Sequence, residues 1–284
     1  MKYHVAADQT LLEALTLACP DSSKTTLRSW IKDGRVLVDG HSVRLSNHPL
    51  VAGQQLLLAD RAQFIRCPNV KEGITVYYED AHLVVVEKPE GLLTVSTDFE
   101  KNATLHAYLK THYRSRPVYP VHRLDQDTSG VMMFALSEEA RELLKVVFEK
   151  HAIERMYTAI VEGHPEESSG TWTSYLLEDP QYKVHSVPEG EKGSIAITHY
   201  ETLTQAKRYT VLQLRLETGR KNQIRVHCQD AGCPIVGDSK YGAVSNPIRR
   251  MALHASLLAF VHPVTRKPLR FESPLPEAFK KLVR

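Results

Sequence analysis

The hydrophobic pattern of the first sixty residues predicts two short helices. Apolar residues recur at helical spacing after Thr10, and Pro20 stops the run. Thr10 and Glu13 have the spacing of a capping box, which marks the start of a helix. After a polar break, Ser22 or Ser23 can cap a second helix that has its own apolar face.

The second helix is followed by the pattern of a β-hairpin. Asp33-Gly34 ends the helix, and Asp39-Gly40 forms a turn between the strand-like runs 35–38 and 41–45. A charged helix face is usually only solvated, so a basic stripe beside the apolar face assigns no function by itself. The residues of this basic stripe are Lys24, Arg28, Lys32 and Arg35.

A stretch without periodicity separates this small unit from a larger one. Residues 61–73 hold proline, asparagine, glycine and scattered charge, which is typical of a linker. We therefore predict a small domain over 1–60, a linker over 61–73 and a larger domain over 74–284.

Strand patterns dominate the larger domain. Helical patterns are fewer, and helices are expected only where Asn102 and Ser137 can cap them and over 222–231. We infer an α+β fold in which flanking helices cover a mostly antiparallel sheet. The expected strands lie at 74–78, 82–86, 156–161, 194–203, 209–216, 252–261 and 269–271.

The segment 122–130 holds the strongest candidate for a reactive group. Asp125 lies among cationic residues, short hydroxylic side chains and a glycine, and apolar runs at 118–121 and 131–136 flank the segment. Loops on rigid scaffolds often carry catalytic residues. We expect Asp125 to lie on a loop between two buried strands, where it is ionised and exposed.

Composition adds few constraints. The chain has 284 residues and 42% hydrophobic content, enough for a substantial core and a small extra domain. Its four cysteines lack paired spacing, which indicates free thiols in a reduced compartment.

The chain shows no apolar signal and no run long enough to cross a membrane, so we expect a cytoplasmic location without a membrane partner. A net charge of +3 does not by itself indicate a polyanionic partner.

The sequence predicts neither a metal nor a cofactor. Asp125-Gln126-Asp127 has the spacing of a two-carboxylate metal site, but the neighbouring Thr128 and Ser129 favour a turn or capping role for Asp127. The histidines lack ligand spacing, and there is no glycine-rich nucleotide-binding loop.

Several motifs of the larger domain resemble those of the RluA-like pseudouridine synthases, and in the same order. Residues 121–130 resemble the aspartate signature, residues 154–163 the tyrosine-bearing strand, and residues 218–227 the arginine motif. Residues 234–242 and 253–255 extend the match across most of the domain.

The resemblance implies an enzyme that isomerises uridine to pseudouridine within RNA. The bond from the sugar to the base nitrogen breaks, and the sugar is rejoined to carbon 5 of uracil. On the matched positions, Asp125 is the essential carboxylate, Arg225 pairs with it, and Tyr157 stacks on the target base. Arg123 fills the space that a flipped-out uridine leaves in the RNA. Attack on the sugar, elimination to a glycal and addition to the uracil ring all stay open as the first step.

The amino-terminal part carries a second resemblance. Residues 10–58 resemble the alpha-L RNA-binding module shared with a small-subunit ribosomal protein. The resemblance implies that the basic stripe of the second helix contacts RNA phosphates. Large-subunit ribosomal RNA is then the favoured substrate, transfer RNA is the alternative, and the protein is expected to be a monomer.

Three positions depart from the family pattern. Lys221-Asn222 stands where Thr-His is common, Arg155 where a lysine is usual, and Leu136-Ser137 where a lysine often closes the first motif. None of these changes removes a reacting group, but they bear on which RNA site is chosen.

Two other classes of function stay open at this point. A non-catalytic RNA-binding or ribosome-assembly factor would keep the motifs without the reaction, although Asp125, Tyr157 and Arg225 are all present. A glycoside or nucleoside hydrolase would need a second carboxylate beside Asp125, and the motifs supply no obvious one.

Overall fold

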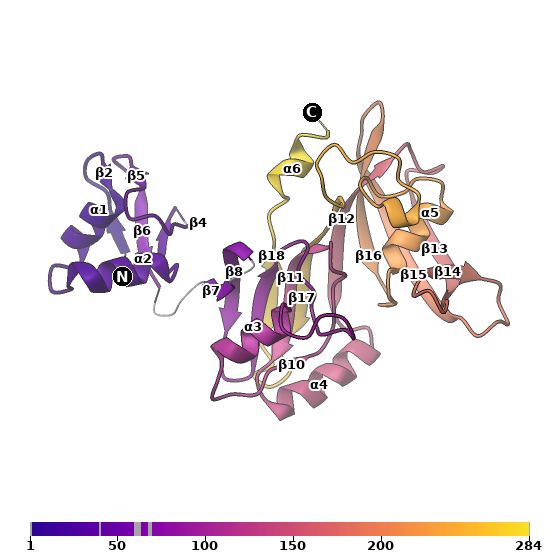
Figure 1. Cartoon of the computed structure of the whole chain (residues 1–284), viewed down its shortest axis with the longest axis horizontal. Coiled ribbons are helices and arrows are strands. Elements are labelled where there is room, and N and C mark those ends of the chain that lie inside the picture. Colours follow the sequence, from indigo (N-terminus) through magenta and orange to yellow (C-terminus); the bar gives the residue numbers. More distant parts are fainter. Residues whose placement is uncertain (1, 40, 60–63, 68–69, 284) are drawn as a thin grey trace. The chain divides into compact units, whose positions relative to one another are not determined.

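The chain divides into two compact units, Met1–Tyr77 and Tyr78–Arg284 (Figure 1). The computed structural model describes residues 2–39, 41–59, 64–67 and 70–283. The boundary between the units lies within strand β8 (Val70–Glu79), close to residue 74, where the sequence predicts the larger domain to begin.

The smaller unit begins with the two expected helices. Helix α1 (Leu11–Ala18) opens at a capping box, in which the Thr10 hydroxyl accepts from the Glu13 N–H and Glu13 Oε2 accepts from the Thr10 N–H at 2.8 Å. Helix α2 (Lys24–Lys32) begins after Ser23, whose hydroxyl accepts a backbone N–H at 3.1 Å. Of the two candidate serines, Ser23 is therefore the cap.

A small antiparallel sheet completes this unit. Its strand order is β1-β6-β3-β4, and the predicted hairpin is formed by β3 and β4, which pair Leu37 with Ser42. Buried aliphatic side chains from both helices and from the sheet form one core. Before residue 60, the strands of the unit are β1 (Lys2–His4), β2 (Gln9–Thr10), β3 (Val36–Val38), β4 (His41–Ser42), β5 (Pro49–Leu50) and β6 (Gln55–Leu58).

Only part of the basic stripe is exposed to solvent. Lys24, Arg28 and Lys32 are exposed on α2. Arg35 is half-buried, its Nε donates to the Ala59 carbonyl at 2.9 Å, and its guanidinium lies 5.0 Å from a tryptophan ring of the same unit. Arg35 is therefore anchored in place.

The stretch predicted as a linker contains strands. β7 (Phe64–Cys67) and β8 pair antiparallel, with Phe64 opposite Thr75 and Ile65 opposite Ile74. Residues 60–63 and 68–69, also part of the expected linker, lie outside the described residues. Backbone pairing does not require alternating side chains, so a hairpin of this kind leaves no periodicity in the sequence.

The larger unit is built on one extended sheet, as the α+β expectation requires. Its strand order runs β14-β13-β15-β16-β12-β17-β11-β9, and of these neighbours only β11 and β17 are described as parallel. The strands are β9 (Leu83–Lys88), β10 (Tyr119–Pro120), β11 (Ser129–Ala135), β12 (Glu154–Glu162), β13 (Ser169–Glu178), β14 (Val184–Val187), β15 (Ser194–Gln205), β16 (Tyr209–Leu216), β17 (Leu253–Val261) and β18 (Pro268–Glu272).

Buried strands fix the position of the candidate loop. All residues of β11 are buried, whereas β10 is partly exposed, so Asp125 lies between one buried strand and one surface strand. Gly130 is the second residue of β11 and has φ +121°, and a Cβ there would lie 2.2 Å from the Ala255 carbonyl oxygen on β17. Only glycine allows this close approach, which sets the end of the loop against the sheet.

The helices of the larger unit lie against two parts of the sheet. α3 (Leu105–His112) and α4 (Glu138–Glu149) lie beside the β9 and β11 half, and α5 (Gln223–Asp230) lies beside β13 to β16 (Figure 1). α6 (Glu277–Lys280) and a short 3-10 helix, Ser239–Tyr241, complete the set within the described residues.

The two expected capping residues of these helices have different outcomes. Ser137 caps α4 as predicted, because its hydroxyl accepts from the Ala140 N–H at 3.2 Å. The cap of α3 is Thr104, and Asn102 is wrong, because only Thr104 immediately precedes the first helical residue and reaches the Ala107 N–H at 3.1 Å.

Two strands of the larger unit have no counterpart in the sequence prediction. β13 and β14 pair antiparallel at one end of the sheet, and most residues of β13 are exposed or half-buried. An edge hairpin of this kind buries few apolar side chains, so it lacks the hydrophobic signal of a core strand.

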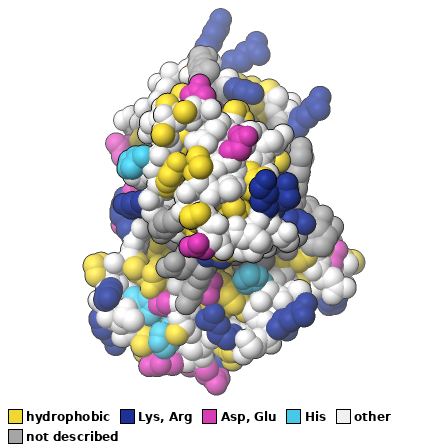
Figure 2. All heavy atoms as spheres, turned by 90° about the vertical axis from the view of Figure 1, so that its left-hand side faces the viewer, with side chains coloured by type: hydrophobic (Ala, Val, Ile, Leu, Met, Phe, Trp, Pro, Cys, Tyr) yellow, Lys and Arg dark blue, Asp and Glu magenta, His cyan; other side chains and the backbone are white. Residues whose placement is uncertain are grey.

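The surface charge is mixed. On the face seen in Figure 2, Lys and Arg side chains are spread among apolar and acidic ones. Cys228 and Cys233 are buried free thiols, and the side chain of Cys67 lies outside the described residues. None of the described helices is long and apolar enough to span a membrane.

Candidate active site

A cavity of about 530 Å³ in the larger unit brings the predicted site residues together. The loop 121–128, the first residues of β12 and the turn 216–225 form much of its wall. The residues predicted for substrate binding and catalysis all line it: Arg123, Asp125, Tyr157 and Arg225. The basic stripe belongs to the other compact unit and is no part of this cavity.

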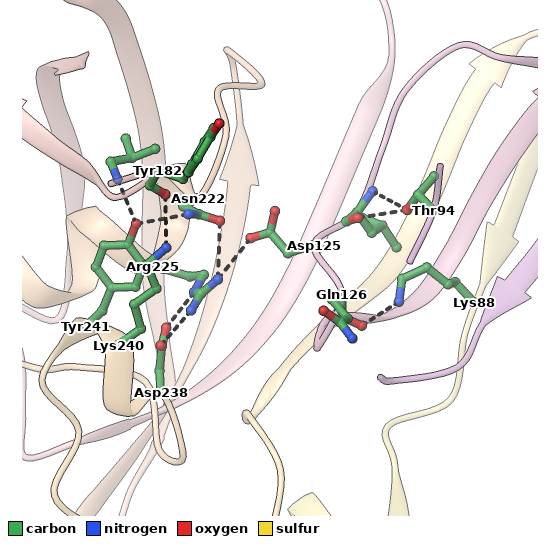
Figure 3. Close-up of polar contacts among 12 residues, drawn as sticks. Lys88, Thr94, Asp125, Gln126, Tyr182, Asn222, Arg225, Asp238, Lys240 and Tyr241 are labelled. Carbon is green, nitrogen blue, oxygen red and sulfur yellow. Dashed lines mark hydrogen bonds and ion pairs between the residues drawn. The ribbon is translucent and has the colours of Figure 1, made fainter. Parts of the chain in front are cut away.

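Asp125 faces Arg225 across the cavity wall (Figure 3). Arg225 Nη1 lies 3.7 Å from Asp125 Oδ2, which is an ion pair and is too long for a hydrogen bond. The side chain of Asp125 is 21% exposed, so the expectation of an exposed aspartate is wrong. Burial raises the pKa of Asp125, and the charges of Arg225, Arg123 and Lys88 oppose that rise. Its ionised form therefore depends on these cations.

Arg225 is held in place by Asp238. Arg225 Nε donates to Asp238 Oδ2 at 2.6 Å, and Nη2 donates to Oδ1 at 2.7 Å, which is a bidentate pair. Nη1 also donates to Asn222 Oδ1 at 3.2 Å, and the guanidinium lies 4.7 Å from the Tyr241 ring. Only Nη1 is thus directed toward Asp125.

Sequence reasoning assigned no role to Asp238. The residue lies within the matched stretch 234–242, but no local spacing links it to an arginine thirteen positions earlier. Asp238 is buried, and an acidic residue in an otherwise apolar and glycine-containing turn was the available signal.

A buried lysine fastens the loop that carries Asp125. Lys88 Nζ donates to the carbonyls of Pro89 at 2.8 Å, Leu92 at 2.6 Å and Gln126 at 2.8 Å. Burial lowers the pKa of Lys88 to about 7, although Asp127 and Asp125 oppose the change. Lys88 was another residue that sequence reasoning missed.

The other side of the loop is fastened by Thr94. The Thr94 hydroxyl donates to the Leu124 carbonyl at 2.7 Å and accepts from the Leu124 N–H at 3.2 Å. Lys88 and Thr94 therefore fix the backbone on both sides of Asp125, as Figure 3 shows. These hydrogen bonds hold the loop in place, as the predicted catalytic role of Asp125 would require.

Tyr157 and Arg123 occupy different depths of the site. Tyr157, on β12, is 7% exposed, and burial raises the pKa of its phenol, so it stays protonated at neutral pH. Arg123 is exposed, as its predicted role of entering the RNA would require. Asp127 lies in the turn 126–127, in line with its predicted turn role, and lines a second cavity of about 470 Å³.

The described residues include no group of three or more histidine, cysteine or acidic side chains that could hold a metal ion. The side chains that line the cavity supply acid–base and hydrogen-bonding chemistry: the Asp125 carboxylate has two arginines close to it, and the Tyr157 phenol and the Glu149 carboxylate also line the wall.

Comparison with known proteins agrees with this arrangement. Residues 82–230 match the family model of RNA pseudouridylate synthases. An uncharacterized RNA pseudouridine synthase of Bacillus subtilis, YlyB, is 33% identical over 93% of this chain and 89% of its own length. Ribosomal large subunit pseudouridine synthase D of Pseudomonas aeruginosa is 33% identical over 92% of this chain and 86% of its own.

Two solved human structures share the fold. Human RNA pseudouridylate synthase domain containing 4 superposes with a TM-score of 0.60 at 25% identity, over 72% of this chain and 90% of its own. Human RNA pseudouridylate synthase domain containing 1 gives 0.58 at 28% identity, over 74% and 86%. The chain therefore belongs to the RNA pseudouridine synthase family, a family of isomerases that act on RNA.

Proposed function

We propose that this protein converts uridine to pseudouridine in large-subunit ribosomal RNA, with Asp125 as the essential carboxylate. The observation that carries the assignment is the recessed Asp125 carboxylate, which Arg225 faces at 3.7 Å in a cavity that Tyr157 also lines. Relatives named as ribosomal large subunit pseudouridine synthases support the substrate, since one covers 92% of this chain. Transfer RNA is the alternative substrate.

The geometry suits a reaction at an electron-poor sugar. A carboxylate near the anomeric carbon can form a covalent adduct or stabilise the positive charge that develops as the base departs. Arg225 keeps this carboxylate ionised and oriented. Tyr157 offers a ring for stacking on uracil and a protonated hydroxyl that can move a proton.

The target uridine must leave its stack to reach Asp125. A base inside a stacked RNA cannot approach a carboxylate that is only 21% exposed. Arg123 is exposed and lies two residues from Asp125, so it can occupy the space that the flipped nucleotide leaves. A contact from Arg123 to a phosphate is the simpler alternative.

The smaller unit is proposed to bind RNA in the manner of an alpha-L module. Lys24, Arg28 and Lys32 present an exposed row of charge on α2, and each contact to a phosphate releases a counterion. Arg35 is already bonded to the Ala59 carbonyl, so we assign it a supporting contact at the end of the row.

Release of tritium from carbon 5 of uracil tests this function, because the new carbon bond must displace that hydrogen. Wild type should release tritium from unmodified large-subunit ribosomal RNA, and Asp125→Asn should not. Asp98→Asn is the matched control, because Asp98 is a well-exposed aspartate outside the cavity.

Each other outcome points to a stated alternative. Release from transfer RNA alone would change the substrate. Free uracil would indicate a hydrolase. No release from either RNA, with tight binding retained, would indicate a non-catalytic RNA-binding factor.

A further inference from the structure

Arg155 places a positive charge without a partner in the wall of the active-site cavity. The residue is only 9% exposed, and its Nε is buried without a hydrogen-bond partner in the described part of the chain. A buried guanidinium with an unsatisfied N–H is costly, and native proteins rarely keep one without use. Because Nε is closed to solvent, a ligand is expected to compensate the charge at the outer nitrogens of the guanidinium, which form no ion pair with the described residues.

Arg155 packs against neighbouring groups, but no described residue accepts a hydrogen bond from its guanidinium. Its guanidinium carbon lies 5.6 Å from the Phe148 ring. A Cβ on Gly219 would lie 2.7 Å from Nη1, so the glycine allows the guanidinium to lie against the 218–220 turn. The nearby His122 is half-buried and neutral, since desolvation and the charge of Arg155 lower its pKa to about 3. No acidic side chain of the described residues forms an ion pair with Arg155.

Arg155 and Tyr157 are two residues apart on β12, and both line the cavity. Alternate residues of a strand share one face and lie roughly 7 Å apart. A uridine that stacks on Tyr157 therefore extends its own sugar-phosphate backbone within reach of Arg155.

The charges around the cavity favour a phosphate as the ligand of Arg155. Arg225 is neutralised by Asp238 and Asp125, whereas Arg155 has no such partner among the described residues. A uracil oxygen would satisfy an N–H but would leave the charge uncompensated. A phosphate offers both the acceptors and the charge, and its geometry matches a guanidinium.

We propose that Arg155 binds the RNA backbone phosphate adjacent to the target uridine and thereby positions the sugar against Asp125. This proposal rests on the proposed function, because it assumes that a uridine of RNA enters the cavity. Binding energy from the non-reacting phosphate then fixes the reacting atoms. Arg155 is a binding and positioning residue, and it is not the group that reacts.

The test combines protein variants with neutral linkages in the RNA. A synthetic fragment around the uridine identified by tritium release is made with a methylphosphonate on either its 5′ or its 3′ side. For wild type, one of the two linkages should weaken binding on the order of tenfold. Arg155→Met should weaken binding of native RNA by a similar factor, and the modified linkage should cause no further weakening in this variant.

Three controls separate this contact from a structural role. Arg215→Met removes an exposed arginine of β16 outside the cavity, and its binding should respond to the modified linkage as wild type does. Arg155→Met should melt at the temperature of wild type or above it, because an unpaired buried charge is removed. Arg155→Lys keeps the charge but not the planar fork, so its binding should be intermediate.

Additive effects of Arg155→Met and the linkage that weakens wild-type binding, no effect of either linkage on wild type, or wild-type binding by Arg155→Met would overturn the proposal. If wild type releases no tritium from any RNA, the proposed function fails separately. The phosphate contact is then measured on a single-stranded oligouridine. The salt dependence of its binding should fall by about 0.7 in slope for Arg155→Met, and an unchanged slope would refute the contact.

Discussion

Asp238 holds Arg225 by two hydrogen bonds to separate guanidinium nitrogens, at 2.6 and 2.7 Å. The remaining Nη1 is aimed at Asp125, 3.7 Å away. Asp238 thus fixes the position of Arg225, and Asp125 forms an ion pair with it. Because the two carboxylates have different roles, removal of Arg225 and removal of the Asp238 charge should shift the pKa of Asp125 in opposite directions.

Removal of the cation should make Asp125 harder to ionise. The pKa of Asp125 is raised by burial, and Arg225 is the first of the charges that oppose the rise. In Arg225→Met, the acid limb of the rate of tritium release should move to higher pH, and the maximal rate should fall by roughly a hundredfold. An acid limb at the wild-type position would mean that Arg225 does not set the ionisation of Asp125.

Removal of the charge of Asp238 should act in the other direction. The Asp238 carboxylate raises the pKa of Asp125, so Asp238→Asn should move the acid limb to lower pH. The maximal rate should still fall, by roughly tenfold to a hundredfold, because Arg225 loses part of its bidentate anchor. The measurement is the pH dependence of single-turnover tritium release, and a shift in the same direction as for Arg225→Met contradicts the assigned geometry.

The sequence predicted the residues of this site better than their geometry. Asp125, Tyr157, Arg123 and Arg225 meet in one cavity, but the first was expected to be exposed and is recessed. Burial follows from tertiary packing of distant segments, which local sequence does not encode. Asp238 was overlooked for the same reason, since its partner is in a different element.

The fold shows the same limit. Helices with a cap and an apolar face, such as α2 and α4, were predictable because both signals are local. The edge hairpin β13–β14 was not, because its stability comes from pairing with a neighbouring strand and not from apolar alternation.

The buried amine of Lys88 should make stability depend on pH. An unfolded chain keeps this amine protonated up to about its ordinary pKa of 10.5, whereas burial lowers the folded value to about 7. Between these values the unfolded state binds more protons, so the stabilising contribution grows as the pH rises from 7 to 10.5 and is lost as the pH falls through 7.

Denaturant unfolding of wild type and Lys88→Met over pH 6 to 10 measures this effect. The variant should be less stable at every pH, because three carbonyls lose their donor, and its stability should rise less with pH. Parallel pH profiles for the two proteins would show that Lys88 titrates normally.

The close approach at Gly130 should be essential for folding of the larger unit. In Gly130→Ala, the new Cβ would lie 2.2 Å from a backbone oxygen at an unfavourable φ of +121°, so unfolding free energy should fall by at least about 3 kcal/mol. Gly190→Ala is the matched control: its φ is +98°, but no atom lies within 4 Å of the new Cβ. Its unfolding free energy should fall by only about 1–3 kcal/mol. Equal decreases in urea unfolding would show that φ, and not the close approach to Ala255, determines the cost.

The exposed part of the basic stripe should contribute to RNA affinity without affecting the chemical step. Replacement of Lys24, Arg28 and Lys32 by glutamine should weaken binding of ribosomal RNA. The slope of log binding constant against log salt concentration should become shallower by about 0.7–0.9 for each phosphate that the variant no longer neutralises. At saturating RNA the rate of tritium release should equal that of wild type, because these residues belong to the other compact unit. Lys145→Gln, which replaces an exposed lysine of α4 outside the cavity, is the control for reduced surface charge. A triple variant that keeps both the affinity and the salt slope of wild type would remove the smaller unit from the RNA-binding surface.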